Sequence, residues 1–414
     1  MKKVMILGAG RGQIPIMNLC KGYGWFVIAV SPEGDYPGIK IADKVIYENV
    51  KDYEKVYLKA REEKIDAILT DQLDAGVYTA SYVAEKLGIK GIGTTTSMYF
   101  TNKFEMRKAA EKIGINVPKS VCVSNIEEAR NAINSSVLLS FPLMMKPVDS
   151  DASRGVYKIY SFAELEEKFD NSLGYSKSKK VIIEQFITGK EYVVEAFTRN
   201  YHTTNLVVGH RDYFEIPDTF IPNATVFVDA ESANSKIEEE LKSINTKLVE
   251  GFGLSFGITH AEYLFDEKTN IIYLVEIAAR GGGVFISSEL IPAACGVNAN
   301  DLLVKEALCL DDNDPIVITS GASAYFCYLT PEGIVSKLNG IDKVEMINGV
   351  RKAFFDNIEI GMKTRSIRDK SSRKGPILVQ GQTKEDCYKT IKNVKDLLEI
   401  EVTDGNCVKN AIWN

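Results

Sequence analysis

Short apolar runs and amphipathic stretches alternate along the first hundred residues of the chain. The runs KVMILG, WFVIAVS and IDAILTD predict strands, and the first of them passes into a glycine turn. The stretches QIPIMNLCKGYG, DYEKVYLKAREEK and AGVYTASYVAEKLG predict helices, two of which end at a glycine. Strands that alternate with helices are typical of a parallel, doubly wound sheet. We therefore expect an α/β, Rossmann-like domain over residues 1–98.

The pattern changes after residue 98. The stretch TNKFEMRKAAEKIG predicts a helix that ends at Gly114, and Pro118 marks the start of a new unit. Over residues 121–195 the signals are strand, helix, strand, loop, strand, helix and two strands, which predicts a small antiparallel α+β subdomain. A less regular section, residues 198–230, leads to a helix and then to two strands that each contain an acidic residue.

From about residue 311 the chain has short strands, such as ASAYFCYL and GPILVQG, and the helix TKEDCYKTIKNVKDLL. A chain of 414 residues is too long for one ordinary core, so two to three domains are expected. We divide it into an N-terminal domain (1–98), a central domain (99–310) that contains the small subdomain, and a C-terminal α+β domain (311–414).

Two carboxylates interrupt apolar runs in the central domain. Glu262 lies in THAEYLF and Glu276 in IIYLVEIA, and the turn-rich link DEKTN predicts an antiparallel hairpin. With the turn centred on Thr269, the two glutamates lie directly opposite each other and face the same side. Opposed like charges among core residues are destabilising, and a divalent cation such as Mg²⁺ or Mn²⁺ resolves this. In the alternative, one glutamate faces solvent and the other pairs with Arg280; we favour the cation.

Two further segments have residues that suit a phosphate or a nucleotide. In FPLMMKPVDSDASRGV, Lys146 ends a strand and small residues continue to Gly155, so that a lysine charge and backbone N–H groups can surround phosphate oxygens. In VIIEQFITGKEYVVE, a short link joins the strand that ends near Glu184 to a strand that begins at Glu191. Backbone groups of such a link can bond adenine, and a carboxylate can accept ribose hydroxyls. Taken alone, the first segment fits an ordinary surface hairpin as well as it fits a phosphate loop. The second segment alone would be interpreted as an ordinary hairpin without a ligand.

The turn GAGRGQ has glycines at positions 8, 10 and 12, but Gln13 stands where a dinucleotide-binding motif has its third glycine. We therefore expect a tight strand-to-helix turn rather than a nicotinamide site. Such a turn lies at the carboxyl edge of the sheet, so it is a candidate substrate contact, as are residues 71–74 and 281–288. The basic loop SIRDKSSRKG is expected to be a solvated turn rather than a substrate contact, although Arg373 precedes a strand that should pack near the site.

Composition argues against several classes of protein. A net charge of −6 argues against a nucleic-acid or anionic-membrane partner. No apolar stretch approaches the ~20 residues that span a bilayer, and the N-terminal run is too short for a signal peptide. The three histidines form no metal-binding pair at helical spacing, and the seven cysteines show no C-x-x-C spacing, which suits reduced thiols in the cytoplasm.

Taken together and in this order, the segments resemble the ATP-grasp superfamily. The resemblance rests on TNKFEMR with Lys103, on MMKP with the small-residue loop, on EQFITGKE, on HAEYLF and on VEIAARGGG. It extends from about residue 1 to 390 and is strongest over residues 99–290. Within the superfamily the chain is most similar to carboxylate–amine ligases related to the carboxyaminoimidazole ribonucleotide synthetases and the L-amino acid ligases, with the carbamoyl-phosphate-synthase-like group close to them.

The resemblance implies an ATP-grasp fold in which residues 121–195 form a lid, and it implies ATP and Mg²⁺ (or Mn²⁺) as cofactors. Glu262 and Glu276 would bind the metal, and Lys146 and Arg280 would offset charge during catalysis. The residues implied to bind ATP are Lys103, Lys146, Ser153, Gly155, Glu184, Gln185, Phe186, Ile187 and Glu191. Among these, Glu184 with the link 185–187 would meet adenine, and Glu191 the ribose.

The activity that the resemblance implies is a ligation. ATP phosphorylates a small carboxylate, ADP leaves, and an amine then attacks the acyl phosphate to form a C–N bond. Three alternatives stay open: a kinase or acyl-phosphate former without amine transfer, a nucleotide-binding regulatory protein without catalysis, and a nicotinamide oxidoreductase that uses the glycine turn. The expected partners are small molecules and, as is common in this class, a second copy of the chain in a homodimer.

The sequence departs from the family pattern at two places. Many members have an asparagine two residues after the second metal-binding glutamate, where this chain has Ala278, so one or two metal ions remain compatible with the sequence. The carboxyaminoimidazole synthetases have a His–Asn–Ser-type stretch after the arginine, where this chain has GGGVFIS, which weakens a purine-pathway assignment.

Overall fold

The N-terminal part forms the parallel sheet that the sequence predicts. A computed structural model describes residues 1–150, 154–216, 219–310, 314–368, 370–405 and 407–414. The sheet has the order β3-β2-β1-β4, and every pairing in it is parallel. Its edge strand β3 was not predicted from the sequence, because its short run has only one buried side chain, Ile46. The strands are β1 (Lys3–Leu7), β2 (Phe26–Ser31), β3 (Lys44–Tyr47) and β4 (Ala67–Leu69).

Both faces of this sheet are covered, as a doubly wound sheet requires. Met5 and Leu7 of β1 pack under α2 (Tyr53–Glu63) and α3 (Asp74–Leu87). Val4 and Ile6 point to the other side, where α1 (Ile14–Gly22), α9 (Ile291–Cys295) and α10 (Ala299–Ala307) complete the core. The N-terminal domain therefore shares one hydrophobic core with the central part of the chain.

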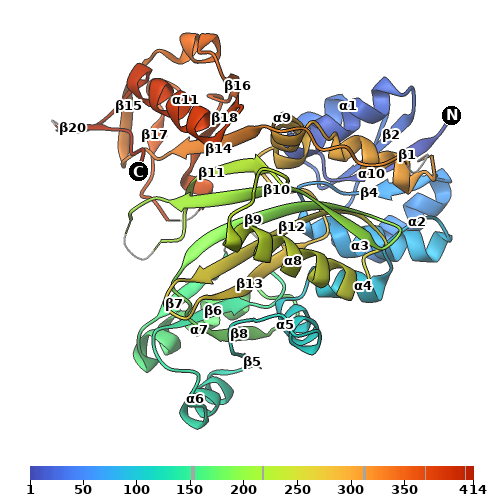
Figure 1. Ribbon diagram of the computed structural model, residues 1–414, viewed down its shortest axis with the longest axis horizontal. Coiled ribbons are helices and arrows are strands. Elements are labelled where there is room, and N and C mark those ends of the chain that lie inside the picture. The colour runs from blue at the N-terminus through green and yellow to red at the C-terminus, as the bar shows by residue number, and fades with distance from the viewer. Residues whose placement is uncertain (151–153, 217–218, 311–313, 369, 406) are drawn as a thin grey trace.

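An eight-stranded antiparallel sheet forms the centre of the molecule (Figure 1). Its order is β13-β12-β9-β10-β11-β14-β18-β16, so strands from before and after residue 310 lie in one sheet. Helix α8 (Lys236–Gly251) packs on one face, together with α4 (Thr94–Tyr99) and α5 (Lys103–Lys112). The strands are β9 (Lys190–Arg199), β10 (His202–Tyr213), β11 (Pro222–Asp229), β12 (Phe256–Asp266), β13 (Ile271–Ala278), β14 (Ala322–Tyr328), β16 (Val350–Ala353) and β18 (Lys374–Gly381).

The section 198–230, which looked irregular in sequence, is mostly the paired strands β10 and β11. Threonine, asparagine, histidine and aspartate interrupt the apolar alternation of β10, yet its centre, Leu206–Gly209, is buried. Neighbouring strands on both sides pair with β10, which supplies hydrogen bonds that the sequence pattern does not reveal. The irregular assignment was therefore wrong for this section.

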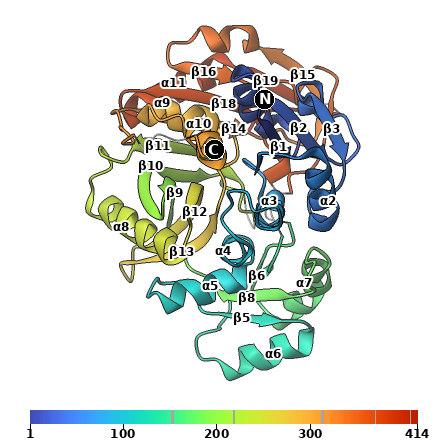
Figure 2. The same cartoon turned by 90° about the vertical axis from the view of Figure 1, so that its right-hand side faces the viewer.

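The elements predicted to form a lid make a small α+β unit, called the lid below, at the end of the molecule opposite the C-terminal strands (Figures 1 and 2). Its antiparallel sheet has the order β5-β8-β6-β7. Leu143 and Met145 pack under α6 (Ile126–Ser135) and α7 (Phe162–Gly174), so Met144 and Lys146 of the same strand face the other way. The strands are β5 (Ser120–Val123), β6 (Leu143–Pro147), β7 (Tyr157–Ile159) and β8 (Val181–Gln185). The next strand, β9, begins inside the predicted lid range but pairs in the central sheet.

The C-terminal part adds a second antiparallel sheet, β17-β15-β19-β20, beside the central one. Helix α11 (Lys384–Leu397) packs against β14 and β18 through Cys387, Ile391 and Val394. The strands are β15 (Gly333–Asn339), β17 (Lys363–Thr364), β19 (Glu399–Asp404) and β20 (Cys407–Asn410). Within the described ranges, the longest and most apolar helices still fall short of what a membrane crossing needs.

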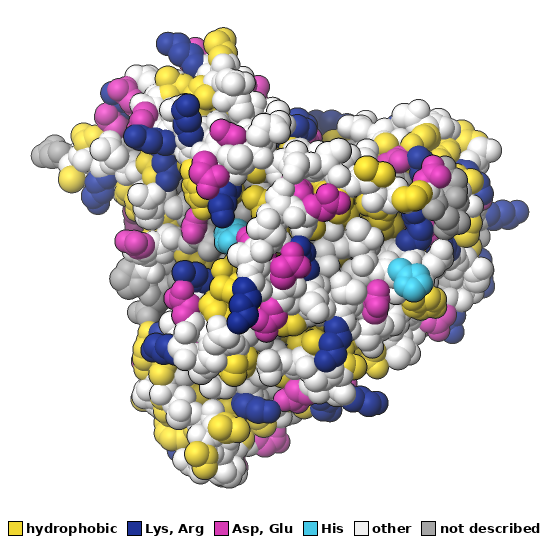
Figure 3. Space-filling model, viewed as in Figure 1, with side chains coloured by type: hydrophobic (Ala, Val, Ile, Leu, Met, Phe, Trp, Pro, Cys, Tyr) yellow, Lys and Arg dark blue, Asp and Glu magenta, His cyan; other side chains and the backbone are white. Residues whose placement is uncertain are grey.

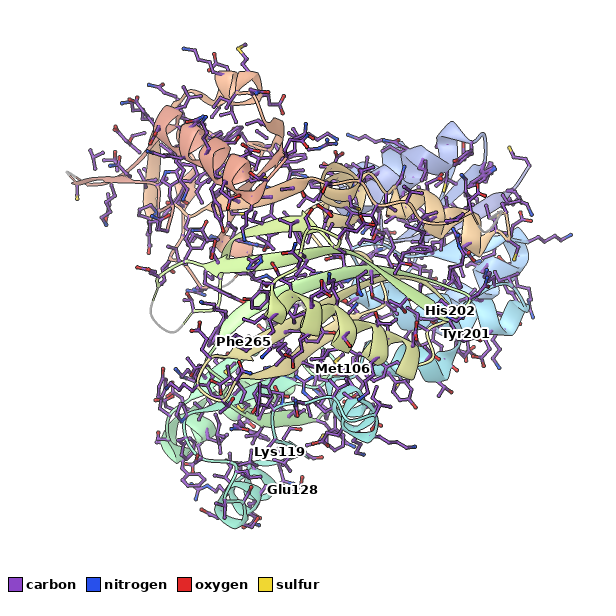
Figure 4. The ribbon with its side chains drawn as sticks, in the orientation of Figure 1. Met106, Lys119, Glu128, Tyr201, His202 and Phe265 are labelled. Carbon is purple, nitrogen blue, oxygen red and sulfur yellow. The ribbon has the colours of Figure 1, made fainter. Side chains whose placement is uncertain are left out.

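The link between β8 and β9 depends on a glycine. A Cβ atom on Gly189 would lie 2.2 Å from the carbonyl oxygen of Phe265, which lies at the end of β12 nearest the lid (Figure 4). Backbone cannot yield as a flexible side chain can, so any larger residue must displace one of the two strands.

We predict that Gly189→Ala lowers the free energy of unfolding by roughly 1–3 kcal/mol, because the added methyl group displaces the link. Urea denaturation measures this change. The matched control is Gly174→Ala at the end of α7, where a Cβ atom meets nothing within 4 Å. Equal stability of the two variants would show that the link relaxes freely.

Candidate functional site

A large cavity lies between the lid, the central sheet and the N-terminal domain. Its volume is about 1190 Å³, and it is lined by many of the residues that the sequence singled out as well as by a C-terminal loop. Sites for drug-sized ligands have roughly 300–1,000 Å³, so this cavity has room for a nucleotide and a second small molecule. On the face shown in Figure 3, basic and acidic side chains are interspersed without a continuous basic surface.

The two acidic strands form the predicted antiparallel hairpin, with a β-bulge between the turn and the glutamates. Residues of β12 and β13 are antiparallel partners, and Glu262 lies directly opposite Glu276. Both side chains line the cavity. The predicted opposition of the two glutamates is confirmed, and it places two carboxylates side by side at the wall of the cavity. The predicted turn centre at Thr269 was wrong, because Tyr263 pairs with Leu274 and a β-bulge then brings Glu262 opposite Glu276.

Each of these carboxylates has a cationic neighbour from another element. Arg211 of β10 donates to Glu262 Oε1 at 2.6 Å, and His260 Nε2 lies 3.2 Å from the same oxygen. Lys103, the first residue of α5, donates to Glu276 Oε1 at 2.8 Å. The alternative in which Glu276 pairs with Arg280 is therefore wrong.

Charge and burial act in opposite directions on Glu262. Burial raises its pKa, but Arg211 and the hydrogen bond to His260 outweigh burial and hold the pKa well below its usual range. Burial also raises the pKa of Glu191, and there Arg211 does not outweigh it, because the charge of Glu262 adds to the rise. The surroundings of Glu262 therefore favour its ionised form, which is the form that a metal ligand needs.

The donor set fits a nucleotide-bound magnesium ion better than a free-standing one. In the described ranges, no group of three or more histidine, cysteine or acidic side chains is arranged to hold a metal ion. Glu262 and Glu276 supply two hard oxygen ligands, and Mg²⁺ prefers six oxygens, often including phosphates and waters. Phosphate oxygens in the cavity would complete such a shell.

The two predicted phosphate lysines come from different elements and face the same cavity. Lys103 also donates to the carbonyl oxygen of Ser150 at 2.9 Å, which ties α5 to the start of the small-residue loop. Lys146 lies on β6 with its Nζ 2.7 Å from Glu184 Oε2. Ser153 lies outside the described residues. Gly155 is packed against the lid, where a Cβ atom would lie 2.9 Å from the ring of Tyr175.

Glu184 is buried at the centre of an ion-pair network. Arg107 of α5 donates through Nε to Glu184 Oε1 at 2.8 Å, while Oε2 faces Lys146. Burial alone would raise the pKa of Glu184, but the charges of Arg107 and Lys146 lower it from 4.5 to about 2. Both carboxylate oxygens of Glu184 are therefore committed to cations of the protein.

The link after Glu184 has the geometry of an adenine contact. Gln185, Phe186 and Ile187 line the cavity, and Lys158 of the lid lies over the ring of Phe186 at 4.0 Å from its centroid. Within the described part of the chain, the backbone groups of Phe186 and Ile187 have no protein hydrogen-bond partner. Buried backbone groups are seldom unpaired, so these are available to a ligand.

Glu191, predicted to meet the ribose, lies at the start of β9 and lines the cavity. It accepts hydrogen bonds from Arg211 and from the hydroxyl of Tyr213. Arg211 therefore joins Glu191 to Glu262, across three neighbouring strands. These contacts fix the direction of the Glu191 carboxylate.

Arg280 is held by the N-terminal domain. Its Nε and Nη2 donate to the two oxygens of Asp74, both at 2.8 Å. The loop that follows is fixed from the same side, because Gly281 N donates to Asp71 at 3.1 Å and Phe285 N donates to Gln72 at 3.0 Å. A bidentate pair of this kind orients a guanidinium firmly, and here it points Arg280 along the wall of the cavity.

Of the other predicted substrate contacts, some line the cavity and some do not. Gln72, Leu73 and Asp74 line it, as do Gly283, Val284 and Ile286. None of residues 8–13, all of which are described, belongs to the lining. Gln13 fills that turn itself, donating to the carbonyl oxygen of Asp71 at 2.6 Å and accepting from Gly10 N at 3.0 Å.

The basic loop was expected to be a solvated turn, and this was wrong for Lys370 and Arg373, which line the cavity. Four residues of the site were not singled out from the sequence: Arg107, Arg211, Tyr213 and His260. Two of them had a usable signal, since Arg107 follows Lys103 by one helical turn and His260 precedes Glu262 by one strand period. Arg211 and Tyr213 lay in the section assigned as irregular.

The comparisons with known proteins agree with this geometry. Residues 139–288 match the ATP-grasp domain family. The chain is 28% identical over 280 residues to a formate-dependent phosphoribosylglycinamide formyltransferase of Prochlorococcus marinus, covering 64% of this chain and 68% of that protein. It is 22% identical over 290 residues to an L-arginine-specific L-amino acid ligase of Bacillus subtilis, covering 67% and 66%.

A crystal structure of an L-amino acid ligase from Bacillus licheniformis superposes with a TM-score of 0.80 at 21% identity, covering 98% of this chain and 99% of that one. The chain therefore contains an ATP-grasp domain and has the ATP-grasp fold from end to end. The expected superfamily and fold class are confirmed.

We predict that the metal site depends on nucleotide. Manganese titration followed by electron paramagnetic resonance should give a Kd above about 1 mM for the protein alone, because two carboxylates that are already paired make a poor site. Addition of a non-hydrolysable ATP analogue should tighten binding at least tenfold, and Glu276→Gln should abolish the gain. Tight binding without nucleotide would contradict the two-ligand site.

We also predict that Glu184 contributes to stability in a defined pH window. Its folded pKa is depressed from 4.5 to about 2, so its contribution is present above pH 4.5 and is lost as the pH falls toward 2. Glu184→Gln should lower the free energy of unfolding by roughly 1–3 kcal/mol at pH 6, and the difference from wild type should shrink on acidification. Exposed Glu167→Gln is the control; a difference that stays constant with pH would contradict the ion pair.

Proposed function

We propose that this protein is an ATP- and Mg²⁺-dependent ligase that activates a small carboxylate as an acyl phosphate and joins it to an amine, forming a C–N bond. The observation that carries the proposal is the opposed pair Glu262 and Glu276, with Lys103 and Lys146 on the same cavity. These groups suit the triphosphate and metal of a nucleotide. The similarity to an L-amino acid ligase and to a formate-dependent formyltransferase supports the same class of reaction.

Phosphoryl transfer depends mainly on positioning and on charge neutralisation, which the lining residues can provide. Lys103 and Lys146 face the position of the phosphates from two sides, and the link 185–187 offers backbone groups to adenine. A bound Mg²⁺ would offset charge on the phosphate oxygens, and Glu262 and Glu276 would hold it. This chemistry does not require a triad of nucleophile, base and acid.

Arg280 has the role of holding the carboxylate that is activated. Its bidentate bond to Asp74 leaves the guanidinium fixed at the wall of the cavity, close to the N-terminal domain. The N–H groups of Arg280 that do not bond Asp74 or Gly281 can donate hydrogen bonds to the carboxylate and to the oxyanion that forms when the amine attacks the acyl carbon. The lid would exclude water, which otherwise hydrolyses the acyl phosphate.

The remaining expectations stay part of the proposal. The substrates are small molecules, the second partner is a further copy of the chain in a homodimer, and the compartment is the cytoplasm. The domain limits 1–98, 99–310 and 311–414, with the lid at 121–195, are kept as proposed units, although the central sheet includes strands from both sides of residue 310.

ADP release across a panel of small carboxylates, with and without hydroxylamine, tests the function. Hydroxylamine converts an acyl phosphate into a hydroxamate, so we expect one carboxylate to yield both ADP and hydroxamate. ADP without hydroxamate would favour a kinase. Wild-type protein that binds ATP but releases no ADP with any carboxylate would favour a regulatory protein.

Two variants assign the residues within this assay. Glu276→Gln should reduce ADP release by at least about 100-fold with the fold intact, because it removes a metal-binding charge. Lys146→Ala should chiefly raise the KM for ATP, by roughly tenfold or more. Exposed Lys112→Ala, at the end of α5, is the control for the loss of a lysine. Unchanged kinetics in either site variant would remove that residue from the proposed site.

A further inference from the structure

Arg107 is among the largest fully buried side chains of the protein, with 1% of its surface exposed, and it does not line the cavity. It lies on α5 one turn after Lys103, and Lys103 does line the cavity. Its guanidinium makes two strong contacts: Nε donates to Glu184 Oε1 at 2.8 Å, and Nη2 donates to the carbonyl oxygen of Val275 at 2.6 Å. Val275 immediately precedes Glu276.

Glu184 divides its two oxygens between two cations. Oε1 accepts from Arg107, and Oε2 lies 2.7 Å from Nζ of Lys146. Arginine, glutamate and lysine together have a net charge of +1. If Arg107 were absent, Glu184 and Lys146 would form a neutral pair, and the field of Lys146 at a phosphate would be largely cancelled.

We propose that Arg107 is a positioning residue of the nucleotide site. It neutralises the buried Glu184, so that Lys146 keeps its charge for the phosphates of ATP, and it fixes the backbone next to Glu276. The inference rests on the proposed function only in taking the cavity as a nucleotide site. It requires nothing about the carboxylate or the amine.

A purely structural ion pair is the alternative, and the chain contains a matched example. Glu306 is 2% exposed and divides its oxygens in the same way, between Arg199 Nε at 3.0 Å and Lys90. Arg199, Glu306 and Lys90 are all described, and none of them belongs to the cavity lining. Loss of Arg199 therefore measures what the loss of a buried arginine–glutamate pair does away from the nucleotide.

The experiment is a titration of MgATP into the full-length protein by isothermal calorimetry, with thermal unfolding recorded for each variant. Arg107→Met should weaken the binding of MgATP by about tenfold or more, since it leaves Glu184 to neutralise Lys146. Arg199→Met should be destabilised by a similar amount but should bind MgATP within about twofold of wild type. Arg107→Lys keeps the charge and should also stay close to wild type.

The double variant Arg107→Met/Glu184→Gln separates charge from packing. When Glu184 is replaced by neutral glutamine, no negative charge cancels the field of Lys146 at the phosphates. The affinity for MgATP should therefore recover to within about threefold of wild type. A loss that persists in the double variant would overturn the electrostatic role in favour of packing. Wild-type affinity in Arg107→Met would overturn the proposal altogether.

This result is independent of catalysis. Wild-type protein that binds MgATP but forms no hydroxamate would contradict the proposed ligase and leave the binding comparison valid. Wild-type protein without affinity for MgATP would contradict both. If Arg107→Met does not fold, Arg107→Lys and Glu184→Gln are compared instead. The Glu184→Gln variant should bind MgATP at least as tightly as wild type. Weaker binding by that variant would overturn the proposal.

Discussion

The crowding of carboxylates at and beneath the wall of the cavity is the constraint on which the site depends. Glu262 and Glu276 face each other across two strands, and Glu184 is enclosed between the lid and the central sheet. Isolated buried charges are costly, so each must have a cation within reach. The cations come from elsewhere: Arg211 from β10, and Lys103 and Arg107 from α5.

The same constraint brings distant parts of the chain together. Helix α5 supplies a cation to two of the three carboxylates, so it joins the hairpin of β12 and β13 to the base of the lid. The loop after Arg280 is held from two further sides. Gln72 of the N-terminal domain accepts from Phe285 N, and the ring of Phe285 stacks on Phe354 at 4.8 Å. Phosphate-facing and substrate-facing groups are thereby fixed in one frame.

The sequence was sufficient where the physical rule is local. Side chains in strands alternate with a period of two, so the two acidic strands were expected to place Glu262 and Glu276 opposite each other. The pairing is as expected, but it needs a β-bulge beside Tyr263 that the sequence did not reveal. Alternating strands and helices likewise identified the parallel N-terminal sheet. The cavity could be anticipated as a set of motifs, because each motif ends at a strand edge or begins a helix.

The sequence was insufficient where partners are chosen by tertiary packing. That Arg211 would join Glu191 and Glu262 depends on β9 lying between β10 and β12, which no local pattern encodes. The commitment of Glu184 to Arg107 and Lys146 is of the same kind, as is the approach of Lys370 to the cavity. Strand β10 was not predicted because its polar residues interrupt the alternation of apolar and polar side chains. Hydrogen bonds from the neighbouring strands β9 and β11 stabilise it instead.

The central sheet also bears on how the molecule moves. The C-terminal strands β14, β16 and β18 are hydrogen-bonded into that sheet, so the C-terminal part cannot swing away without breaking it. The described strands of the lid form a sheet of their own, joined to the rest through α5 and the link before β9. The described strands of the lid can therefore shift against the central sheet without breaking any of its ladders, whereas the C-terminal strands cannot.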